Sequence, residues 1–243
     1  IPRYAAAVSV IRAGRHVMLE KPPGATLAEC QSLERLAREA GVSIYATWHS
    51  READRVAAAK AWLRDRKINR LEVTWKEDVR RWHPGQDWIF EIGGLGVFDP
   101  GINAFSILTE ILPEPFHVDY SVLHYPENRQ MPIAAEIRFA YPGAKSAGAV
   151  LDFRQEGPQT WSIEIETDGG KLALHDGGAR MEIDGQLEGA TDSSDLTGEY
   201  PRLYARMAAI VARGESDMDL APMVHVADAF TLGKRQVVEA FHF

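Results

Sequence analysis

Two short segments of the sequence place side chains that could exchange a proton or bind a hydroxyl group. In the first, Glu20-Lys21-Pro22 follows a short apolar run of strand type at residues 16–19. A lysine held by prolines at the exit of a buried strand lies where parallel sheets bind their ligands. It can donate to an oxygen there and, if its pKa is lowered, exchange a proton. The alternative is that Glu20 and Lys21 are solvated loop charges, which is the more frequent case for so short a motif.

The second segment, residues 93–103, contains an aspartate and an asparagine four residues apart. On a helix, Asp99 and Asn103 would lie one above the other on the same face. The carboxylate could then accept from a hydroxyl group and the carboxamide could donate to it. In the alternative, Asp99 is a helix N-cap with Pro100 at the first helical position. Taken alone, this pair of residues favours the cap.

The elements that must position Lys21 lie in the first fifty residues, where helix and strand signals alternate. We expect a helix over residues 4–13, a strand over 16–19, a helix from the capping box at Thr26 to Gly41, and a strand over 42–47. This order is the trailing half of a parallel, doubly wound sheet. Cys30 falls on the apolar face of the second helix, which predicts a buried, inert thiol in a reducing, cytoplasmic setting.

Beyond residue 51 the pattern changes to strands with alternating apolar and polar residues. After a helix over about 52–65, we expect strands at residues 71–75, 118–125, 133–141, 149–155, 161–167 and 172–175. A polar surface loop is expected over 185–198 and two closing helices near 199–213 and 222–241. The predicted fold class is therefore α/β followed by α+β. A partial Rossmann-type sheet, residues 1–50, precedes an open-faced, mainly antiparallel sheet domain, residues 51–243, with helices on one side and the last helices able to pack back on the first domain.

Composition excludes several classes of protein. The 243 residues are 45% hydrophobic and 26% charged, with a formal net charge of −8, which argues against nucleic acid as a partner. No apolar run reaches the roughly 18 residues that a membrane helix needs. The single cysteine excludes an intramolecular disulfide framework. The histidines have no metal-ligand spacing, so no metal site is expected.

Together, the two segments resemble the glucose–fructose oxidoreductase and inositol dehydrogenase family. The hallmark of that family is Glu-Lys-Pro at the end of a sheet strand, then Gly-Gly, then an Asp with a His four residues later. Here these are Glu20-Lys21-Pro22, Gly93-Gly94 and Asp99, with Asn103 in place of the usual His. The resemblance implies a dinucleotide-binding domain joined to an open-faced sheet domain.

A narrower resemblance covers nearly the whole chain. Residues 20–26, 47–50, 75–85 and 97–104 look like the bacterial L-arabinose/D-galactose 1-dehydrogenases, which oxidise a cyclic aldose at C1 to its lactone with NAD or NADP. The resemblance implies Lys21, Asp99 and Asn103 as catalytic residues. Sugar contacts and cofactor contacts follow from the same likeness: His49, Glu77, Trp82, His83 and Trp161 for the sugar, and Glu20, Lys21, Pro22 and Trp48 for the cofactor.

The chemistry suits these residue types, because oxidation of C1 removes the hydroxyl proton as hydride leaves the same carbon. We expect Asp99 to be the base and Lys21 to orient the oxygen, although the sequence leaves open which of the two takes the proton. Simple packing remains the alternative for each tryptophan, and a backbone-bonded strand-end histidine remains the alternative for His49.

The start of the chain bears on what the protein can do by itself. The sequence contains no G-x-G-x-x-G and begins at Ile1 without Met, so we expect the first Rossmann strands to lie upstream and this chain alone to bind NAD or NADP weakly. Such a chain would be an inactive fragment of the dehydrogenase. A non-catalytic regulatory homologue that senses a sugar or dinucleotide is a further possibility, although Lys21 and Asp99 are both present. The exposed sheet face predicts a homodimer, while the choice of NAD or NADP and of the aldose stays open.

Overall fold

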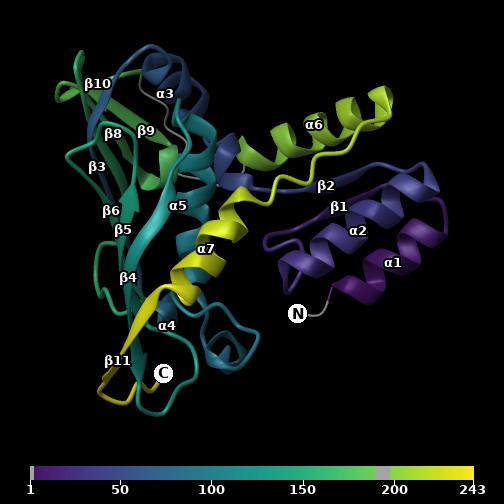
Figure 1. Cartoon of the computed structure of the whole chain (residues 1–243), viewed down its shortest axis with the longest axis horizontal. Coiled ribbons are helices and arrows are strands. Elements are labelled where there is room, and N and C mark those ends of the chain that lie inside the picture. The colour runs from purple at the N-terminus through teal and green to yellow at the C-terminus, as the bar shows by residue number, and fades with distance from the viewer. Residues whose placement is uncertain (1–2, 190–197) are drawn as a thin grey trace.

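The computed structural model describes residues 3–189 and 198–243 and shows a small N-terminal lobe beside a large twisted sheet (Figure 1). The helices are α1 (Tyr4–Arg12), α2 (Leu27–Ala40), α3 (Val56–Leu63), α4 (Val79–Trp82), α5 (Phe98–Ile111), α6 (Glu199–Arg213) and α7 (Ala221–Thr231), with short 3-10 turns η1 (His49–Glu52), η2 (Asp87–Phe90) and η3 (Asp176–Gly178). The strands are β1 (Val17–Leu19), β2 (Ile44–Ala46), β3 (Ile68–Lys76), β4 (His117–Pro126), β5 (Ala134–Ala140), β6 (Ser146–Asp152), β7 (Thr160–Thr167), β8 (Gly170–His175), β9 (Arg180–Ile183), β10 (Gln186–Leu187) and β11 (Gly233–Val238).

The N-terminal lobe has the predicted order of helix, strand, helix, strand. Helix α2 begins where Thr26 accepts a hydrogen bond from the backbone N–H of Glu29, and it ends at Gly41, whose φ of 66° is the left-handed conformation that glycine adopts without strain. Strands β1 and β2 pair in parallel. The outer edge of β2 pairs with the backbone of Asp217, so a segment near the C-terminus completes this small sheet.

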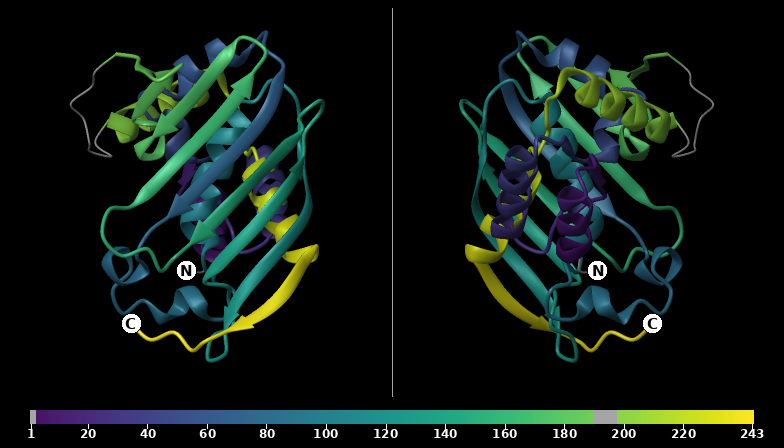
Figure 2. Two further views of the ribbon diagram at one scale, coloured as in Figure 1. Left: turned by 90° about the vertical axis from the view of Figure 1, so that its left-hand side faces the viewer. Right: turned by 90° about the vertical axis from the view of Figure 1, so that its right-hand side faces the viewer.

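The large sheet has nine strands in the order β10-β9-β8-β7-β3-β6-β5-β4-β11. Neighbouring strands are antiparallel except β3 with β6 and β4 with β11, which are parallel. Helices α5 and α7 cover one face, and the other face is open (Figures 1 and 2). The main core lies between these helices and the sheet, and it includes Phe98, Phe105 and Leu151. The predicted fold class is confirmed, whereas the domain boundary at residue 50 stays a prediction.

The C-terminal helix is shorter than the predicted range 222–241. It ends at Thr231, and residues 233–238 form strand β11 beside β4. A side chain at Gly233 would lie 2.7 Å from the carbonyl oxygen of Ala229 and 2.6 Å from Leu123. The glycine therefore lets the chain turn closely against β4, where the β-branched pair Val237-Val238 suits a strand.

Two further predictions were wrong in detail. The helix expected over 52–65 is interrupted at Ala53, whose backbone is extended. Two residues later, the backbone N–H of Arg55 donates a hydrogen bond to the carbonyl oxygen of Gly178. Tertiary contact with the η3 turn thus overrides local propensity. The loop expected over 185–198 contains the short strand β10, while its residues 190–197 lie outside the described part of the chain.

Candidate functional site

Lys21 and Asp99, 78 positions apart in the sequence, meet side by side. Lys21 Nζ donates to the carbonyl oxygen of Asp99 at 2.8 Å and to its carboxylate Oδ2 at 3.1 Å. Only 16% of the Lys21 side chain and 11% of the Asp99 side chain are exposed. Lys21 follows the carboxyl end of β1 by two residues, and Asp99 lies in the first turn of α5. A partly buried ion pair therefore stands at the sheet edge where ligands bind in doubly wound folds.

This geometry excludes the two structural alternatives for these residues. Lys21 is not a solvated loop charge, because its ammonium is held by Asp99. Asp99 is not the N-cap of α5 either, since the helix begins after Val97 with no side-chain cap. The carboxylate of Asp99 is directed at Lys21.

Glu77 and His83 lie near this ion pair. His83 Nε2 is 3.6 Å from Asp99 Oδ2. Glu77, which follows β3 and is only 6% exposed, accepts a hydrogen bond from the indole N–H of Trp161 at 2.9 Å. Burial raises the pKa of Glu77 to about 7, although the Trp161 hydrogen bond and the charge of Lys21 oppose this effect and the charge of Asp99 adds to it. Glu77 therefore titrates near neutral pH.

Two tryptophans form an aromatic corner beside Glu77. The rings of Trp82 and Trp161 have centroids 5.5 Å apart and planes inclined by 56°. Trp82 remains 42% exposed, so simple burial in the core does not account for it. A flat, accessible indole surface suits the apolar face of a sugar ring.

Asn103 lies one helical turn after Asp99 on α5 and is half-buried. Within residues 3–189 and 198–243, its carboxamide has no hydrogen-bond partner. Since the two side chains share a helix face, the amide is available to a ligand that contacts Asp99.

His49 pairs with a residue that sequence reasoning missed. Its Nδ1 lies 2.7 Å from Oε2 of Glu199, in the first turn of α6, and both side chains are largely buried. The next residue, Tyr200, donates to the carboxylate of Glu20 at 3.3 Å. The start of α6 thus contacts the segments that follow both β1 and β2. No local pattern could have predicted a pair separated by 150 residues.

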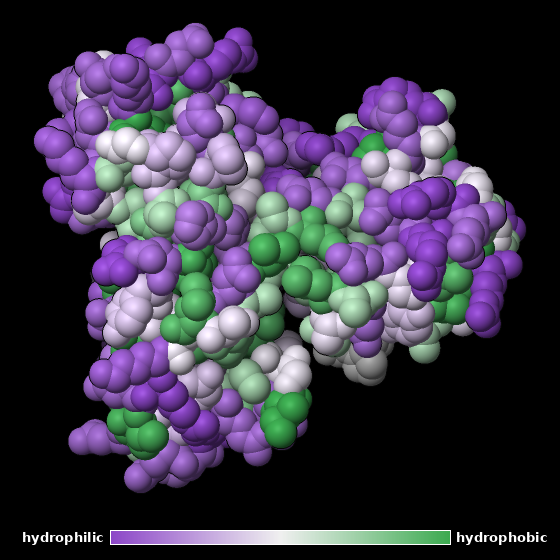
Figure 3. All heavy atoms as spheres, viewed as in Figure 1, coloured by the Kyte–Doolittle hydropathy of each residue, from purple (hydrophilic) through white to green (hydrophobic). Residues whose placement is uncertain are grey.

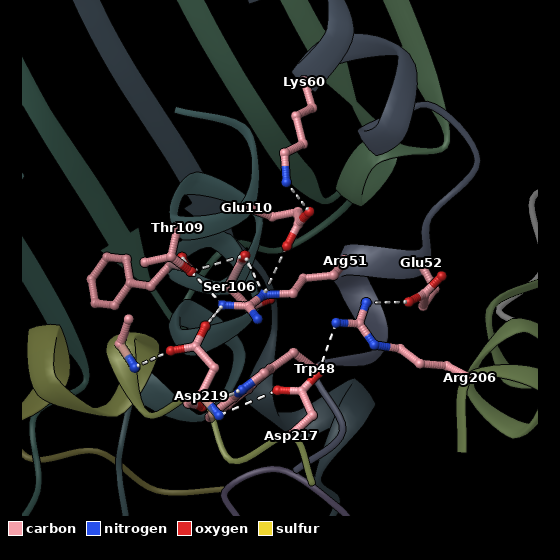
Figure 4. Close-up of polar contacts among 12 residues, drawn as sticks. Trp48, Arg51, Glu52, Lys60, Ser106, Thr109, Glu110, Arg206, Asp217 and Asp219 are labelled. Atoms are coloured by element: carbon pink, nitrogen blue, oxygen red, sulfur yellow. Dashed lines mark hydrogen bonds and ion pairs between the residues drawn. The ribbon is translucent and has the colours of Figure 1, made fainter. Parts of the chain in front are cut away.

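A second missed residue, Arg51, fixes the turn that contains His49. Its guanidinium, 8% exposed, donates to the carbonyl of Ser106 at 3.0 Å, to Thr109 Oγ1 at 2.8 Å and to Asp219 Oδ2 at 2.5 Å (Figure 4). Ser106 and Thr109 lie on α5, the helix of Asp99. Arg51 therefore ties the end of β2 to the helix that presents Asp99 and Asn103.

An apolar cavity of about 470 Å³ lies behind the Lys21 segment. Pro22 and residues 24–28 line one side, and Leu95, Met223 and Phe230 are among those that line the other. The surface view also shows hydrophobic residues gathered between the two lobes (Figure 3). None of the helices in the described residues is long and apolar enough to span a bilayer.

Comparison with known proteins decides the family. Residues 3–47, which contain β1, α2 and β2, match the oxidoreductase family with an NAD-binding Rossmann fold. Over 241 residues the chain is 41% identical to galactose 1-dehydrogenase of Pseudomonas fluorescens, with 99% of this chain and 76% of that protein aligned. The chain belongs to the glucose–fructose oxidoreductase/inositol dehydrogenase family. The resemblance found in the sequence is thereby confirmed.

Solved structures of the family agree. The crystal structure of D-galactose-1-dehydrogenase from Rhizobium etli superposes with a TM-score of 0.93 at 54% identity, covering 99% of this chain and 76% of that one. An inositol dehydrogenase homolog from Azotobacter vinelandii, complexed with NAD+, has a TM-score of 0.74 at 18% identity and covers 93% and 71% of the two chains. At that identity the likeness concerns the fold alone.

The segment after β1 has a donor set that fits the nicotinamide nucleotide of this family. Glu20 exposes a carboxylate, while the partly buried Lys21 offers an ammonium that pairs with Asp99 and Pro22 offers an apolar ring, all at the carboxyl edge of the parallel pair. Trp48 is different, because it is buried in the main core and its indole N–H donates to the carbonyl of Asp219. Its contact with the cofactor stays a prediction.

Proposed function

We propose that this member of the family is an NAD(P)-dependent aldose 1-dehydrogenase that oxidises a pyranose such as L-arabinose or D-galactose at C1 to the lactone. The proposal depends on one observation above all, the Lys21–Asp99 ion pair at the carboxyl edge of the Rossmann strands. The identities of 41% and 54% to two galactose 1-dehydrogenases support the substrate class.

Asp99 accepts the proton of the C1 hydroxyl, while Lys21 donates a hydrogen bond to the same oxygen and orients it. The ion pair favours this assignment, because an ammonium bonded to a carboxylate has no free lone pair with which to act as a base. The C1 hydrogen departs with its bonding electrons, and C1 becomes the lactone carbonyl. NAD or NADP, when bound, supplies the acceptor for this hydride.

The remaining polar groups bind the rest of the sugar. Asn103 lies one helical turn after Asp99, and its amide has no hydrogen-bond partner in residues 3–189 and 198–243. His83 lies 3.6 Å from the Asp99 carboxylate, and Glu77 and His49 offer further hydrogen-bonding groups. Trp82 and Trp161 supply a flat surface for the sugar ring. Glu20, Lys21, Pro22 and Trp48 are the residues proposed to hold the nicotinamide nucleotide.

We also propose that the protein is a homodimer that joins through the open face of the nine-stranded sheet. A shallow groove crosses that face and is lined by Tyr120, Arg138 and Val150 among others. Of these, Tyr120 and Val150 are each 41% exposed, so the groove presents apolar surface that a second copy of the chain could cover. The single, buried Cys30 supports a reducing, cytoplasmic location.

A reduction assay on the full-length protein tests the proposal. NAD and NADP are each combined with D-galactose, L-arabinose, D-fucose and D-glucose, and formation of the reduced nicotinamide is followed. We expect turnover with at least one aldose, and a rate lower by about 100-fold or more with the Asp99→Asn variant. A protein that binds an aldose or a dinucleotide yet reduces neither cofactor with any sugar would instead be the regulatory homologue.

A further inference from the structure

The carboxylate of Glu199 and the imidazole of His49 form a largely buried pair at the turn that follows β2. The turn that contains His49 packs against both α5 and α6, so His49 lies between the helix of Asp99 and the helix of Glu199. The neighbouring contact of Tyr200 with Glu20 places the start of α6 next to Lys21 as well. The pair therefore lies against the helix that carries Asp99 and next to the segment that carries Lys21.

The partner of His49 Nδ1, an ionised carboxylate, indicates which ring nitrogen carries the proton. A carboxylate only accepts hydrogen bonds, so the 2.7 Å contact requires a proton on His49 Nδ1. Ser50 Oγ lies 3.4 Å from the same nitrogen, at the limit of hydrogen bonding. The side chain of Glu199 is 9% exposed, and its carboxylate pairs with His49. Burial of a carboxylate is costly without such a partner.

The opposite nitrogen of His49, Nε2, has no partner among residues 3–189 and 198–243. In a neutral imidazole whose Nδ1 is protonated, Nε2 is a hydrogen-bond acceptor. An acceptor held rigidly by a second residue suits a hydroxyl donor, which is what a pyranose offers at C2, C3 and C4.

We propose that Glu199 is a positioning residue for substrate recognition. Its carboxylate holds the His49 ring in the Nδ1–H form and directs Nε2 at one hydroxyl of the aldose other than the C1 hydroxyl. This inference rests on the proposed function, because it takes the ligand of the cleft to be a sugar. It makes Glu199 a determinant of specificity without contact between Glu199 and the substrate.

Kinetics with monodeoxy sugars test this role. We compare the full-length wild type with Glu199→Ala, Glu199→Gln and a control, Glu215→Ala, which removes an exposed carboxylate paired with Arg213 beyond the far end of α6. For the best aldose we expect Glu199→Ala to lower kcat/KM about 10-fold, mainly through KM, as for one lost hydrogen bond. Glu199→Gln should restore most of this loss, because its amide oxygen still accepts from Nδ1–H. Glu215→Ala should behave as wild type.

The deoxy series separates recognition from a merely structural role. For the one deoxy sugar that lacks the hydroxyl bound by His49, wild type and Glu199→Ala should have equal kcat/KM. The proposal would be overturned if Glu199→Ala lowered kcat/KM by the same factor on every deoxy sugar as on the parent aldose. It would also be overturned if Glu199→Gln lowered kcat/KM as much as Glu199→Ala does. If a variant does not fold, nitrogen NMR of the His49 ring in the wild type tests the proposal instead. A proton on Nε2 with none on Nδ1 would contradict the proposed Nδ1–H form. Failure of the proposed function would look different, with no aldose oxidised by the wild type.

Discussion

Replacement of Glu77 by glutamine isolates the energetic cost of ionising a buried carboxyl group. Glutamine has nearly the same size, and its amide oxygen can still accept the indole hydrogen bond of Trp161. The variant therefore keeps the packing and removes only the titration. Because Glu77 is 6% exposed, solvent screening reduces this cost little.

The sign and magnitude of the effect on the free energy of unfolding follow from the pKa of Glu77, which burial raises from 4.5 to about 7. The folded protein thus binds this proton more tightly than the unfolded chain does. The stabilisation is present below about pH 4.5 and is lost as the pH rises through about 7. At 1.36 kcal/mol per pH unit, the whole effect amounts to about 3 kcal/mol.

Urea denaturation of wild type and Glu77→Gln over a pH series measures this difference. We expect the free energy of unfolding of wild type, relative to the variant, to fall by about 2 kcal/mol or more between about pH 5 and pH 8. Glu91→Gln, at an exposed position, serves as the control and should show no such trend. A difference between wild type and Glu77→Gln that is constant with pH, or that grows as the pH rises, would refute the reasoning.

Three further outcomes are expected. Asp99→Asn should lower kcat by about 100-fold or more, as for a lost general base, while circular dichroism shows an unchanged fold; wild-type turnover would leave Asp99 with no role as base. Trp161→Phe removes the hydrogen bond that opposes the raised pKa of Glu77, so the pH at which Glu77 titrates should rise above that of wild type, and a downward shift would contradict the site geometry. Cys30 is fully buried, and burial raises the pKa of its thiol to about 11, so it should react with a thiol reagent far more slowly in the native protein than in urea; equal rates would exclude the packing described.

Local chemistry predicted those parts of the fold whose causes are local. The capping box at Thr26 and the glycine at residue 41 determine where α2 begins and ends. Alternation of apolar and polar residues identified β7, with one face in the core and the other exposed. By contrast, β11 forms because Gly233 allows a close approach to β4, and no pattern within residues 222–241 reveals that partner.

The site divides in the same way. Lys21 and Asp99 were recognised from motifs, and their position after β1 and at the start of α5 explains why they meet. Glu199 and Arg51 act through partners that are distant in the sequence, His49 in one case and Ser106 in the other. Residue type alone does not distinguish such carboxylates and guanidinium groups from ordinary surface charges.

Transfer of deuterium from C1 of the sugar tests the central claim most directly. The full-length protein is incubated with an aldose deuterated at C1 and with NAD or NADP, and the products are examined by mass spectrometry and NMR. If Lys21 and Asp99 promote oxidation at C1, the deuterium will appear in the reduced nicotinamide and the sugar product will be the lactone or its acid. Deuterium retained in an oxidised sugar would show that another carbon reacts, and would contradict the account.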